Sequence, residues 1–170
     1  VHPPSSVPGV ATIDVTEPGR ARARYRVVLQ RESGPGFFPR PIVASSDDGN
    51  VPENTMDGDL WTRWSAEGDG EWIGFDMGAD GPVSGVAIAW YQGADRTSRF
   101  DVEVAAADDQ SWRQVFSGTS SGTTTDPETY SFDEVTARYL RIVGHGNSAN
   151  AWNSITEVTI PGRTAELPPT

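Results

Sequence analysis

The sequence predicts an all-β protein, a sandwich or jelly roll built from short antiparallel strands. Six runs of four to seven residues alternate apolar and polar side chains, and clusters of Gly, Asp, Ser or Pro bound each run. No segment predicts a helix longer than one turn, and no repeat of about 20–50 residues recurs. This pattern is typical of strands with one buried face. The runs cover residues 72–77, 86–91, 100–104, 112–116, 139–143 and 155–160.

The alternation also predicts where the tryptophans lie. The run 86–91 puts Trp90 on the same strand face as Val86 and Ile88, so we expect Trp90 in the core. The other tryptophans near these runs are expected to pack in the core or against loops, because large aromatic side chains are mostly buried. These are Trp61, Trp64 and Trp72.

Charge divides the chain into three parts. Residues 1–40 carry six arginines against three acidic residues, whereas residues 41–160 carry six arginines against 20 acidic residues. We expect residues 1–40 to be a linker or an extra N-terminal strand, with the alternating stretch 23–29 as that strand. Residues 41–160 are expected to form the folded module, and residues 161–170 a C-terminal tail.

Composition excludes several classes of function. The 170 residues include no cysteine, which rules out disulfides, thiolate metal sites and cysteine nucleophiles. No apolar run is long enough to span a membrane. A net charge of −11 argues against nucleic acid and anionic membranes as partners, because their phosphates would be repelled. We therefore expect no nucleic-acid and no membrane partner.

One group of residues has the chemistry of a calcium site. The segment 54–64 contains Asp57-Gly58-Asp59, a tight turn that can direct carbonyl groups inward, and Glu157 follows about a hundred residues later. Such a set offers only oxygen ligands, which suit Ca²⁺, whereas zinc prefers His or Cys. The EF-hand loop is not matched, because Gly58 is second in its turn rather than sixth. A turn without a metal remains the alternative.

Several segments together resemble the discoidin, or coagulation factor 5/8 type C, superfamily, and more closely its bacterial branch, carbohydrate-binding module family 32. The resemblance covers about 120 residues in the same order as in the family. It implies a discoidin-like jelly-roll sandwich of about eight strands. The segments are 44–46, 54–64, 72–78, 83–86, 137–142 and 152–158.

The resemblance also implies one structural Ca²⁺. Carried over position by position, the ligands are three carbonyl groups, two carboxylates, and the hydroxyl or carbonyl group of Thr62. The carbonyl groups are those of Asn54, Asp59 and Thr156, and the carboxylates are those of Asp57 and Glu157. A metal held there would connect the first long loop to the last strand and stabilise the folded state.

In this family, three loops at one end of the sandwich form the sugar site. Sugars are bound by an aromatic face and by planar donors and acceptors for their hydroxyl groups. Trp152 stands where the family places its stacking aromatic residue, and Arg96 and Arg99 lie in a loop where family members place an arginine. A guanidinium group suits the carboxylate of a uronic acid. The remaining candidates for ligand binding are Glu67, Tyr91, Gln92, His145, Asn147 and Asn150.

Segments 44–50, 62–70 and 141–148 further resemble modules appended to bacterial polysaccharide lyases, alginate lyases among them. The resemblance implies a secreted, extracellular, non-catalytic module that holds a larger enzyme on an acidic polysaccharide such as alginate. We expect the module itself to be monomeric. Neutral glycans of the galactose or β-glucan type remain an alternative ligand.

Two other classes of function fit the sequence less well. Glu67, Asp69 and Glu71 lie on one glycine-rich loop, whereas glycosidase carboxylates face each other across a sugar. A lyase or hydrolase domain lacks support, because the only histidines are His2 and His145, which leaves a Ser-His-Asp arrangement unsupported. Adhesion to proteins or phospholipids, which occurs in the eukaryotic branch, usually accompanies a disulfide and exposed apolar spikes.

Overall fold

The computed structural model describes residues 9–15, 23–29, 42–108 and 111–163, which belong to two compact units, 1–37 and 38–170. In the first unit, β1 (Gly9–Val15) pairs antiparallel with β2 (Ala23–Leu29), with Gly9 opposite Leu29 and Val15 opposite Ala23. The sequence predicts one strand here, and β1 is a second. Most of the predicted tail 161–170 lies outside the described residues.

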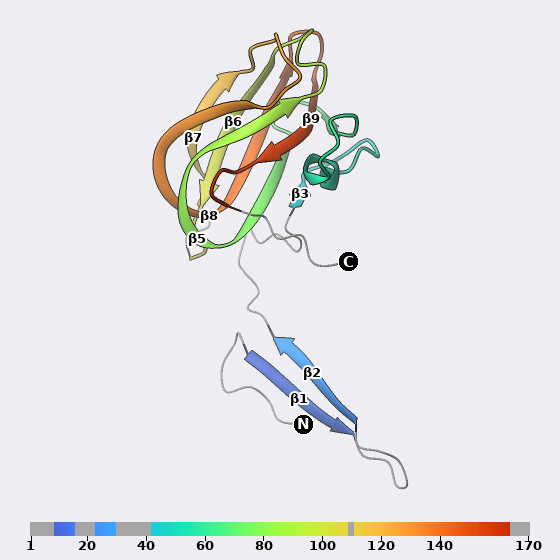
Figure 1. Ribbon diagram of the computed structural model, residues 1–170, viewed down its shortest axis with the longest axis vertical. Helices are drawn as coiled ribbons and strands as arrows, with labels where there is room; N and C mark the ends of the chain where they lie inside the picture. Colours follow the sequence, from blue (N-terminus) through green and yellow to red (C-terminus); the bar gives the residue numbers. More distant parts are fainter. Residues whose placement is uncertain (1–8, 16–22, 30–41, 109–110, 164–170) are drawn as a thin grey trace. The chain divides into compact units, whose positions relative to one another are not determined.

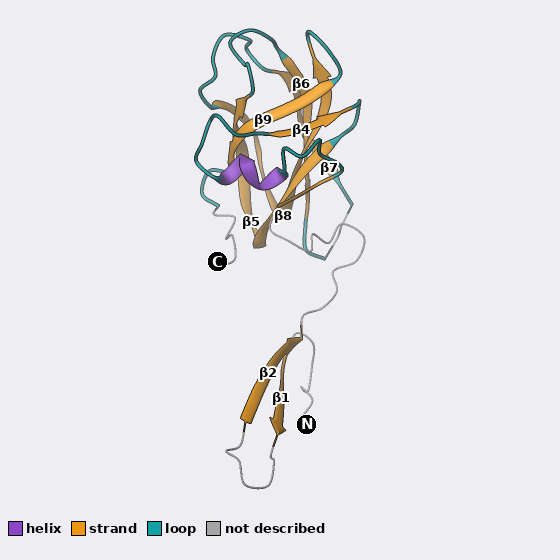
Figure 2. Ribbon diagram, turned by 90° about the vertical axis from the view of Figure 1, so that its right-hand side faces the viewer, coloured by secondary structure: helices purple, strands orange, loops and turns teal. Residues whose placement is uncertain are grey.

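The second unit is an all-β jelly roll (Figure 1). Its seven strands follow the order β4-β9-β5-β8-β6-β7, with β3 paired to β5. In the described part of this unit, the helical content is the short 3₁₀ turn η1 (Pro52–Met56), which lies beside β4 and β9 (Figure 2). The strands are β3 (Ile42–Ala44), β4 (Trp64–Glu67), β5 (Trp72–Trp90), β6 (Ser98–Ala105), β7 (Arg113–Thr119), β8 (Glu128–Asn147) and β9 (Trp152–Thr159).

Two long strands pass from one layer of the sandwich to the other (Figure 1). The first part of β5 pairs with β3 and with the end of β8, whereas its last part pairs with the start of β8 and with β9. The change occurs at register shifts between Asp76 and Gly81 and between Val83 and Gly85. Gly78 there has φ +82°, a conformation that glycine adopts without strain. Each long strand therefore serves both layers, and the predicted runs 72–77 and 86–91 are two parts of β5.

The inner faces of the two layers share one core. Side chains from both layers, among them Trp64, Phe75, Phe100 and Ile155, are at most 1% exposed and belong to a single hydrophobic cluster. Trp90 is 3% exposed and donates from Nε1 to the Tyr130 hydroxyl at 3.0 Å. The alternation predicts the buried face correctly in β6, where Phe100, Val102 and Val104 are buried, and it places Trp90 in the core. No helix of the described residues is long and apolar enough to cross a membrane.

Strand ends and loops gather at one end of the sandwich, which we call the rim. Glu67, the last residue of β4, pairs with Trp152, the first of β9, and Ser98 at the start of β6 pairs with Asn147 at the end of β8. Tyr91 follows β5 and donates its amide to Ser154 at 3.2 Å. The topology therefore brings the loops 68–71, 91–97 and 148–151 to the same end.

Candidate functional site: a sugar-binding rim and a calcium loop

Hydrogen bonds between backbone groups hold the rim loops together. Gly68 donates to the carbonyl of Ala151 at 3.0 Å, and Gly70 donates to that of Gly144 at 2.9 Å. Ser148 donates to Thr97 at 2.8 Å. The loops are thus fixed relative to one another before any ligand is bound.

Buried Asn153 supports these loops from below. Its side chain accepts a hydrogen bond from the amide of Gly146 at 2.8 Å and donates to the carbonyl of Gly68 at 2.7 Å. Gly144 packs so closely on this side chain that a Cβ there would lie 2.2 Å from Asn153 Oδ1. Asn153 and Gly144 therefore set the shape of the rim, and the sequence analysis did not identify either of them.

Two guanidinium groups lie close to the ring of Tyr91. Arg63 is 4.3 Å and Arg96 is 5.4 Å from the centre of its ring, and Arg96 Nε also donates to the carbonyl of Tyr91 at 3.3 Å. Burial and, to a lesser degree, the nearby Arg63 lower the pKa of Arg96. Neither arginine forms an ion pair with a described residue, so both cations can accept an anionic ligand.

Arg63 is the member of this group that the sequence analysis missed. It directly precedes Trp64, whose side chain is 1% exposed in the core. Because side chains alternate along a strand, Arg63 and Ser65 lie on the outer face, where Arg63 Nε donates to Ser65 Oγ at 2.9 Å. The alternation around buried Trp64 was the available signal, but the proximity of Arg63 to Tyr91 depends on how β4, β9 and β5 pair.

Trp152 and Glu67 lie on the same outer face. They are paired across β9 and β4, two residues from the pair Ser154 and Ser65, whose hydroxyl groups are 2.9 Å apart. Trp152 is partly exposed, whereas its neighbour Asn153 is buried on the inner side. The predicted aromatic residue therefore faces outward rather than into the core.

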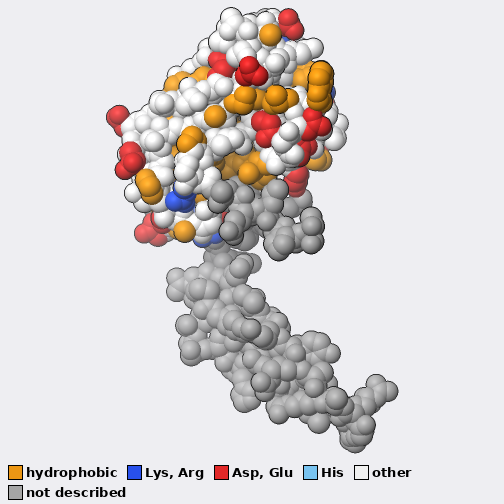
Figure 3. Space-filling model, viewed as in Figure 1, with side chains coloured by type: hydrophobic (Ala, Val, Ile, Leu, Met, Phe, Trp, Pro, Cys, Tyr) orange, Lys and Arg blue, Asp and Glu red, His pale blue; other side chains and the backbone are white. Residues whose placement is uncertain are grey.

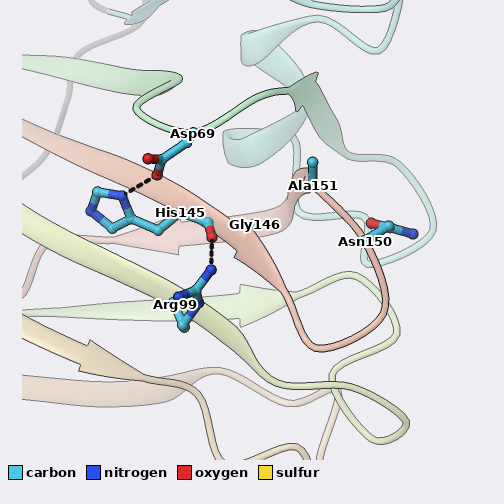
Figure 4. A pocket seen from close by; sticks show the side chains of 6 residues that line it. All are labelled: Asp69, Arg99, His145, Gly146, Asn150 and Ala151. Atoms are coloured by element: carbon cyan, nitrogen blue, oxygen red, sulfur yellow. Dashed lines mark hydrogen bonds and ion pairs between the residues drawn. The ribbon is translucent and has the colours of Figure 1, made fainter.

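A separate pocket opens beside the loop 148–151 (Figure 4). It has a volume of about 510 Å³. Three of the predicted ligand-binding residues line it, whereas Arg96, Tyr91 and Trp152 do not. The lining residues are Asp69, Arg99, His145, Gly146, Asn150 and Ala151. The structure thus divides the predicted sugar-binding set into two groups, which we call the Tyr91 group (Arg63, Tyr91, Arg96) and the Arg99 pocket.

His145 is held between two carboxylates. Its Nδ1 lies 2.6 Å from Asp69 Oδ1, and its Nε2 lies 3.1 Å from Asp101 Oδ2. The hydrogen bond to Asp69, and then the bond to Asp101, raise the pKa of His145 above its ordinary value. Both ring nitrogens can donate only when the ring is protonated. The glycines on either side of His145 predict an exposed loop residue, but the structure shows a ring that is two-thirds buried.

Two other predicted contacts shape loops instead. Asn147 is 9% exposed; its Oδ1 accepts from the amides of Ala149 and Asn150, and its Nδ2 donates to the Trp152 carbonyl at 2.7 Å. Its side chain therefore closes the turn, and its role as a sugar contact stays a prediction. Gln92 is exposed, and its backbone has φ +55° in the turn after β5.

The predicted calcium ligands converge on Thr62. Its Oγ1 lies 2.7 Å from Asp57 Oδ2, 3.0 Å from the Asp59 carbonyl and 3.4 Å from the Asn54 carbonyl. Glu157 reaches the same turn from β9, where its Oε1 accepts from the amide of Gly58 at 2.7 Å. Thr156 donates its hydroxyl to the carbonyl of Ala89 at 3.1 Å.

The electrostatics of this cluster fit a cation. Burial, followed by the nearby Asp57, raises the pKa of Glu157. The pKa of Asp57 is lowered instead, because hydrogen bonds from Thr62 and the Asp59 amide outweigh burial. Within the described residues no group of three or more His, Cys, Asp or Glu side chains is placed to hold a metal. The predicted set consists of two carboxylates and otherwise neutral oxygens, a composition that suits Ca²⁺ better than zinc.

The structure corrects one prediction about the tryptophans. Trp61 is 91% exposed, next to Leu60 at 42%, whereas the sequence analysis expected it in the core or against a loop. The turn from Asp57 to Thr62 is held by Thr62 and by the bond from the Trp61 amide to Asp59 Oδ1, which leaves the Trp61 ring outside. Trp64 is buried as expected, and Trp72 packs in a small cluster with Tyr139 apart from the main core.

A small all-β sandwich with fixed loops, exposed aromatic residues and unpaired cations at one rim has the architecture of a binding module. The chain belongs to the F5/8 type C domain family, which matches residues 41–158. Together with its similarity to solved carbohydrate-binding modules, described next, this match makes the chain a non-catalytic glycan-binding module of carbohydrate-binding module family 32.

Three solved structures show the similarity. The family 32 module of AlyQ, in complex with 4,5-unsaturated mannuronic acid, is 55% identical over 71% of this chain and 93% of that chain, with a TM-score of 0.69. Truncated AlyQ, with its family 32 module and alginate lyase domains, is 53% identical, with a TM-score of 0.69. That match covers 76% of this chain and 33% of the truncated AlyQ chain. A pectin-binding carbohydrate-binding module is 27% identical over 75% of this chain and 92% of that chain, with a TM-score of 0.66. No curated protein matches the chain.

Proposed function

We propose that the module binds an acidic polysaccharide whose residues carry carboxylates, such as alginate. The observation that supports this proposal most directly is the Tyr91 group. Arg63 and Arg96 are partly buried near one another, and neither forms an ion pair with a carboxylate of the described residues, although the charge of Arg63 helps to lower the pKa of Asp48. Like charges close together are unfavourable, and a bound uronate carboxylate would relieve the repulsion through charge-assisted hydrogen bonds.

The outer face around the Tyr91 group has the other features that a pyranose needs. Trp152 offers a partly exposed ring for the apolar face of a sugar, and Glu67 is exposed opposite it. The AlyQ module, which is 55% identical, was solved with an unsaturated mannuronic acid. The ligand of the AlyQ module supports a uronate over a neutral sugar, whereas the Trp152 ring suits a pyranose of either kind.

We further propose the biological setting of the module. AlyQ joins its family 32 module to alginate lyase domains. We infer that residues 41–160 serve in the same way, as a monomeric module that keeps a larger, secreted polysaccharide-degrading enzyme at its substrate. In this role the module increases the local concentration of substrate for the enzyme and takes no part in the chemistry.

We also propose that the oxygen cluster around Thr62 holds a structural Ca²⁺. Asn54, Asp59 and Thr156 would supply carbonyl oxygens, Asp57 and Glu157 carboxylates, and Thr62 its hydroxyl or carbonyl oxygen. The convergence of these oxygens from a loop and from β9 supports the proposal. The ion would neutralise the two adjacent carboxylates and connect the loop to β9.

Affinity gel electrophoresis tests the choice of ligand. Gels containing alginate, polygalacturonate, laminarin or a galactan would be run with the wild-type chain and with Trp152→Ala, after thermal melting shows that the variant is folded. We expect retardation in the first two gels and its loss in the variant. Free migration in both acidic gels together with retardation by laminarin or galactan would overturn the acidic ligand and favour neutral glycans.

A further inference from the structure

The Arg99 pocket contains cationic and polar groups that the Tyr91 group does not use. Neither Arg63, Tyr91 nor Arg96 lines it; it lies instead between the loop 68–71, the start of β6 and the loop 148–151 (Figure 4). Arg99 precedes Phe100, which is 1% exposed in the core, so alternation turns Arg99 to the outside of the sheet. The pocket is therefore a separate place where a ligand could bind.

Arg99 has most of its donors available. One Nη2 hydrogen bond goes to the carbonyl of His145 at 2.8 Å, and this bond fixes the guanidinium group at the pocket. Arginine has five N–H donors, and Arg99 forms no ion pair with any described residue. The acidic neighbours in sequence, Asp95 and Asp101, do not pair with it. A fixed guanidinium group with free donors favours a carboxylate ligand.

Asn150 provides a second donor on the other side of the pocket. Its Oδ1 accepts hydrogen bonds from Asn147 Nδ2 at 2.7 Å and from the Trp152 amide at 3.1 Å. Both bonds use the oxygen and hold the side chain, so the Nδ2 group keeps two free N–H donors among the described residues. Such a group is suited to a sugar hydroxyl or to the second oxygen of a carboxylate.

Asp69, the acidic residue that lines the pocket, and Asp101, which lies next to His145, are already paired. Asp69 and Asp101 both contact His145, so the protonated imidazole offsets part of the repulsion that these carboxylates would exert on an anion. The charged groups that face His145 are these two carboxylates and, through the backbone carbonyl, Arg99. Arg99 is thus the one cation lining the pocket, among the described residues, that no carboxylate neutralises.

We propose that the Arg99 pocket is a second carboxylate-binding subsite, so that one uronate chain crosses the loop 147–152 with one sugar at the Tyr91 group and another at Arg99. This inference rests on the proposed function. Ala151 lines the pocket, and its neighbour Trp152 lies on the face of the Tyr91 group, so the loop is a bridge between the two groups. The module would then prefer oligomers long enough to reach both cations over single uronate residues.

Calorimetric titration with mannuronate oligomers of increasing length tests this inference. The measurements would be made at about pH 6, where His145 is protonated. The wild type, Arg96→Gln, Arg99→Gln and Arg99→Lys are compared, with the exposed Arg113→Gln as a control that also loses one positive charge. Neutral mannan oligomers of equal length show whether the carboxylates are required. Thermal melting confirms that each variant is folded.

We expect the affinity of the wild type to rise with oligomer length. Arg99→Gln should remove this gain, with a loss of about 10- to 100-fold on long oligomers and less than about twofold on the shortest one that binds. Arg99→Lys should restore the gain only in part, because lysine lacks the planar fork. Arg96→Gln should weaken binding at every length, and Arg113→Gln at none.

Three results would contradict the inference. Equal loss at all lengths in Arg99→Gln would mean a single site, and an unchanged affinity would mean that the pocket binds no carboxylate. Either result leaves the proposed function intact as long as Arg96→Gln weakens binding. If the wild type bound no uronate oligomer of any length, the proposed function and the second subsite would both fail.

Discussion

Arginine side chains on the sheets and at the rim differ in their partners. On the sheet faces, Arg138 pairs with Asp76 at 2.8 Å, and Arg141 pairs with Glu103 at 2.5 Å. At the rim, Arg63, Arg96 and Arg99 contact an aromatic ring, a hydroxyl or a carbonyl group, and none contacts a carboxylate of the described residues. Both pairs are partly buried, and the Arg138 pair is bidentate, so these arginines are occupied by the sheet, whereas the unpaired ones are available to a ligand.

Arg96→Ala should weaken the binding of uronate oligomers about 10- to 100-fold, because a charge-assisted hydrogen bond contributes about 1.5–3 kcal/mol. Binding of a neutral glycan, where it occurs, should stay within about twofold. The melting temperature should hardly change or should rise, because removal of Arg96 also removes its repulsion from Arg63. Calorimetry with both ligand types measures the difference, and an equal loss on the neutral glycan would rule out a role in carboxylate recognition.

His145 should make the stability of the module depend on pH. Because its two carboxylate partners raise the folded-state pKa above the ordinary value of 6.5, the His145 contribution is complete below that value. It is lost as the pH rises through the folded-state pKa. His145→Gln should therefore lower the melting temperature more at pH 5.5 than at pH 9. Melting curves across this range, with Asp69→Asn as a second variant, test the sign; a constant difference between wild type and variant would contradict it.

At the level of elements, the rim depends on strands that change layers. Because β5 and β8 bend and pass between the layers, the end of β8 and the start of β9 are brought beside the loop 68–71. The turn 57–62 and β9 meet in a similar way, with Gly58 and Glu157 hydrogen-bonded across 99 positions of sequence. Contacts of this kind hold loops that have little core of their own.

Removal of calcium should lower the stability of the module. At 100 times the dissociation constant a bound ion adds about 2.7 kcal/mol, so EDTA should lower the melting temperature by about 5–15 °C. Glu157→Gln should abolish most of this EDTA effect. It should also make the metal-free protein no less stable than the wild type, because one of two adjacent carboxylates is gone. The exposed Asp133→Asn is the matched control and should behave like the wild type. If the melting temperature of the wild type, loaded with Ca²⁺, did not change on addition of EDTA, the proposed calcium site would be refuted.

Asn153→Ala should lower both the stability of the module and its affinity for uronate oligomers. The substitution leaves the buried amide of Gly146 and the carbonyl of Gly68 without their partner, at a cost of about 1–3 kcal/mol. Uronate affinity should fall as well, although Asn153 does not line the pocket. Thermal melting and calorimetry on the same samples measure both effects. Loss of stability with unchanged affinity would show that the loops keep their shape without Asn153.

At the scale of the whole molecule, the charge of the module opposes its proposed ligand. Residues 41–160 hold six arginines and 20 acidic residues, and acidic side chains are spread over the face shown in Figure 3 with few basic ones between them. A polyuronate is therefore repelled at long range and attracted only close to the rim arginines. Salt screens the distant repulsion more than the close contacts, because the Debye length is about 10 Å at 0.1 M.

The association rate with a long polyuronate should consequently rise when the salt concentration increases from about 10 to 100 mM. The dissociation rate should rise less, because the contacts at the rim are short and partly buried. Surface plasmon resonance with immobilised alginate measures both rates, and a neutral glycan serves as the control. An association rate that falls with salt would show that the rim arginines, and not the overall charge, dominate the encounter.

Local patterns account for what the sequence predicts well. Trp90 was placed in the core from its spacing to Val86 and Ile88, and it is 3% exposed. The first half of β8 (128–136) was missed because few of its side chains are buried, Tyr130 among them, so no clear alternation marks it. Trp61 was misplaced because hydrophobicity alone does not show which way a turn directs its side chain.

The sequence by itself determined the strand class, the buried faces and the chemical character of the loops, because alternation and residue type act over a few neighbouring positions. Only the tertiary structure decided which loop residues act together. Arg63 lies close to Tyr91 although the two residues are 28 positions apart, whereas Arg96 belongs to the Tyr91 group and Arg99 lines the other pocket although only three positions separate them. Strand pairing and the bends of β5 and β8 set these distances, and no local sequence pattern contains them.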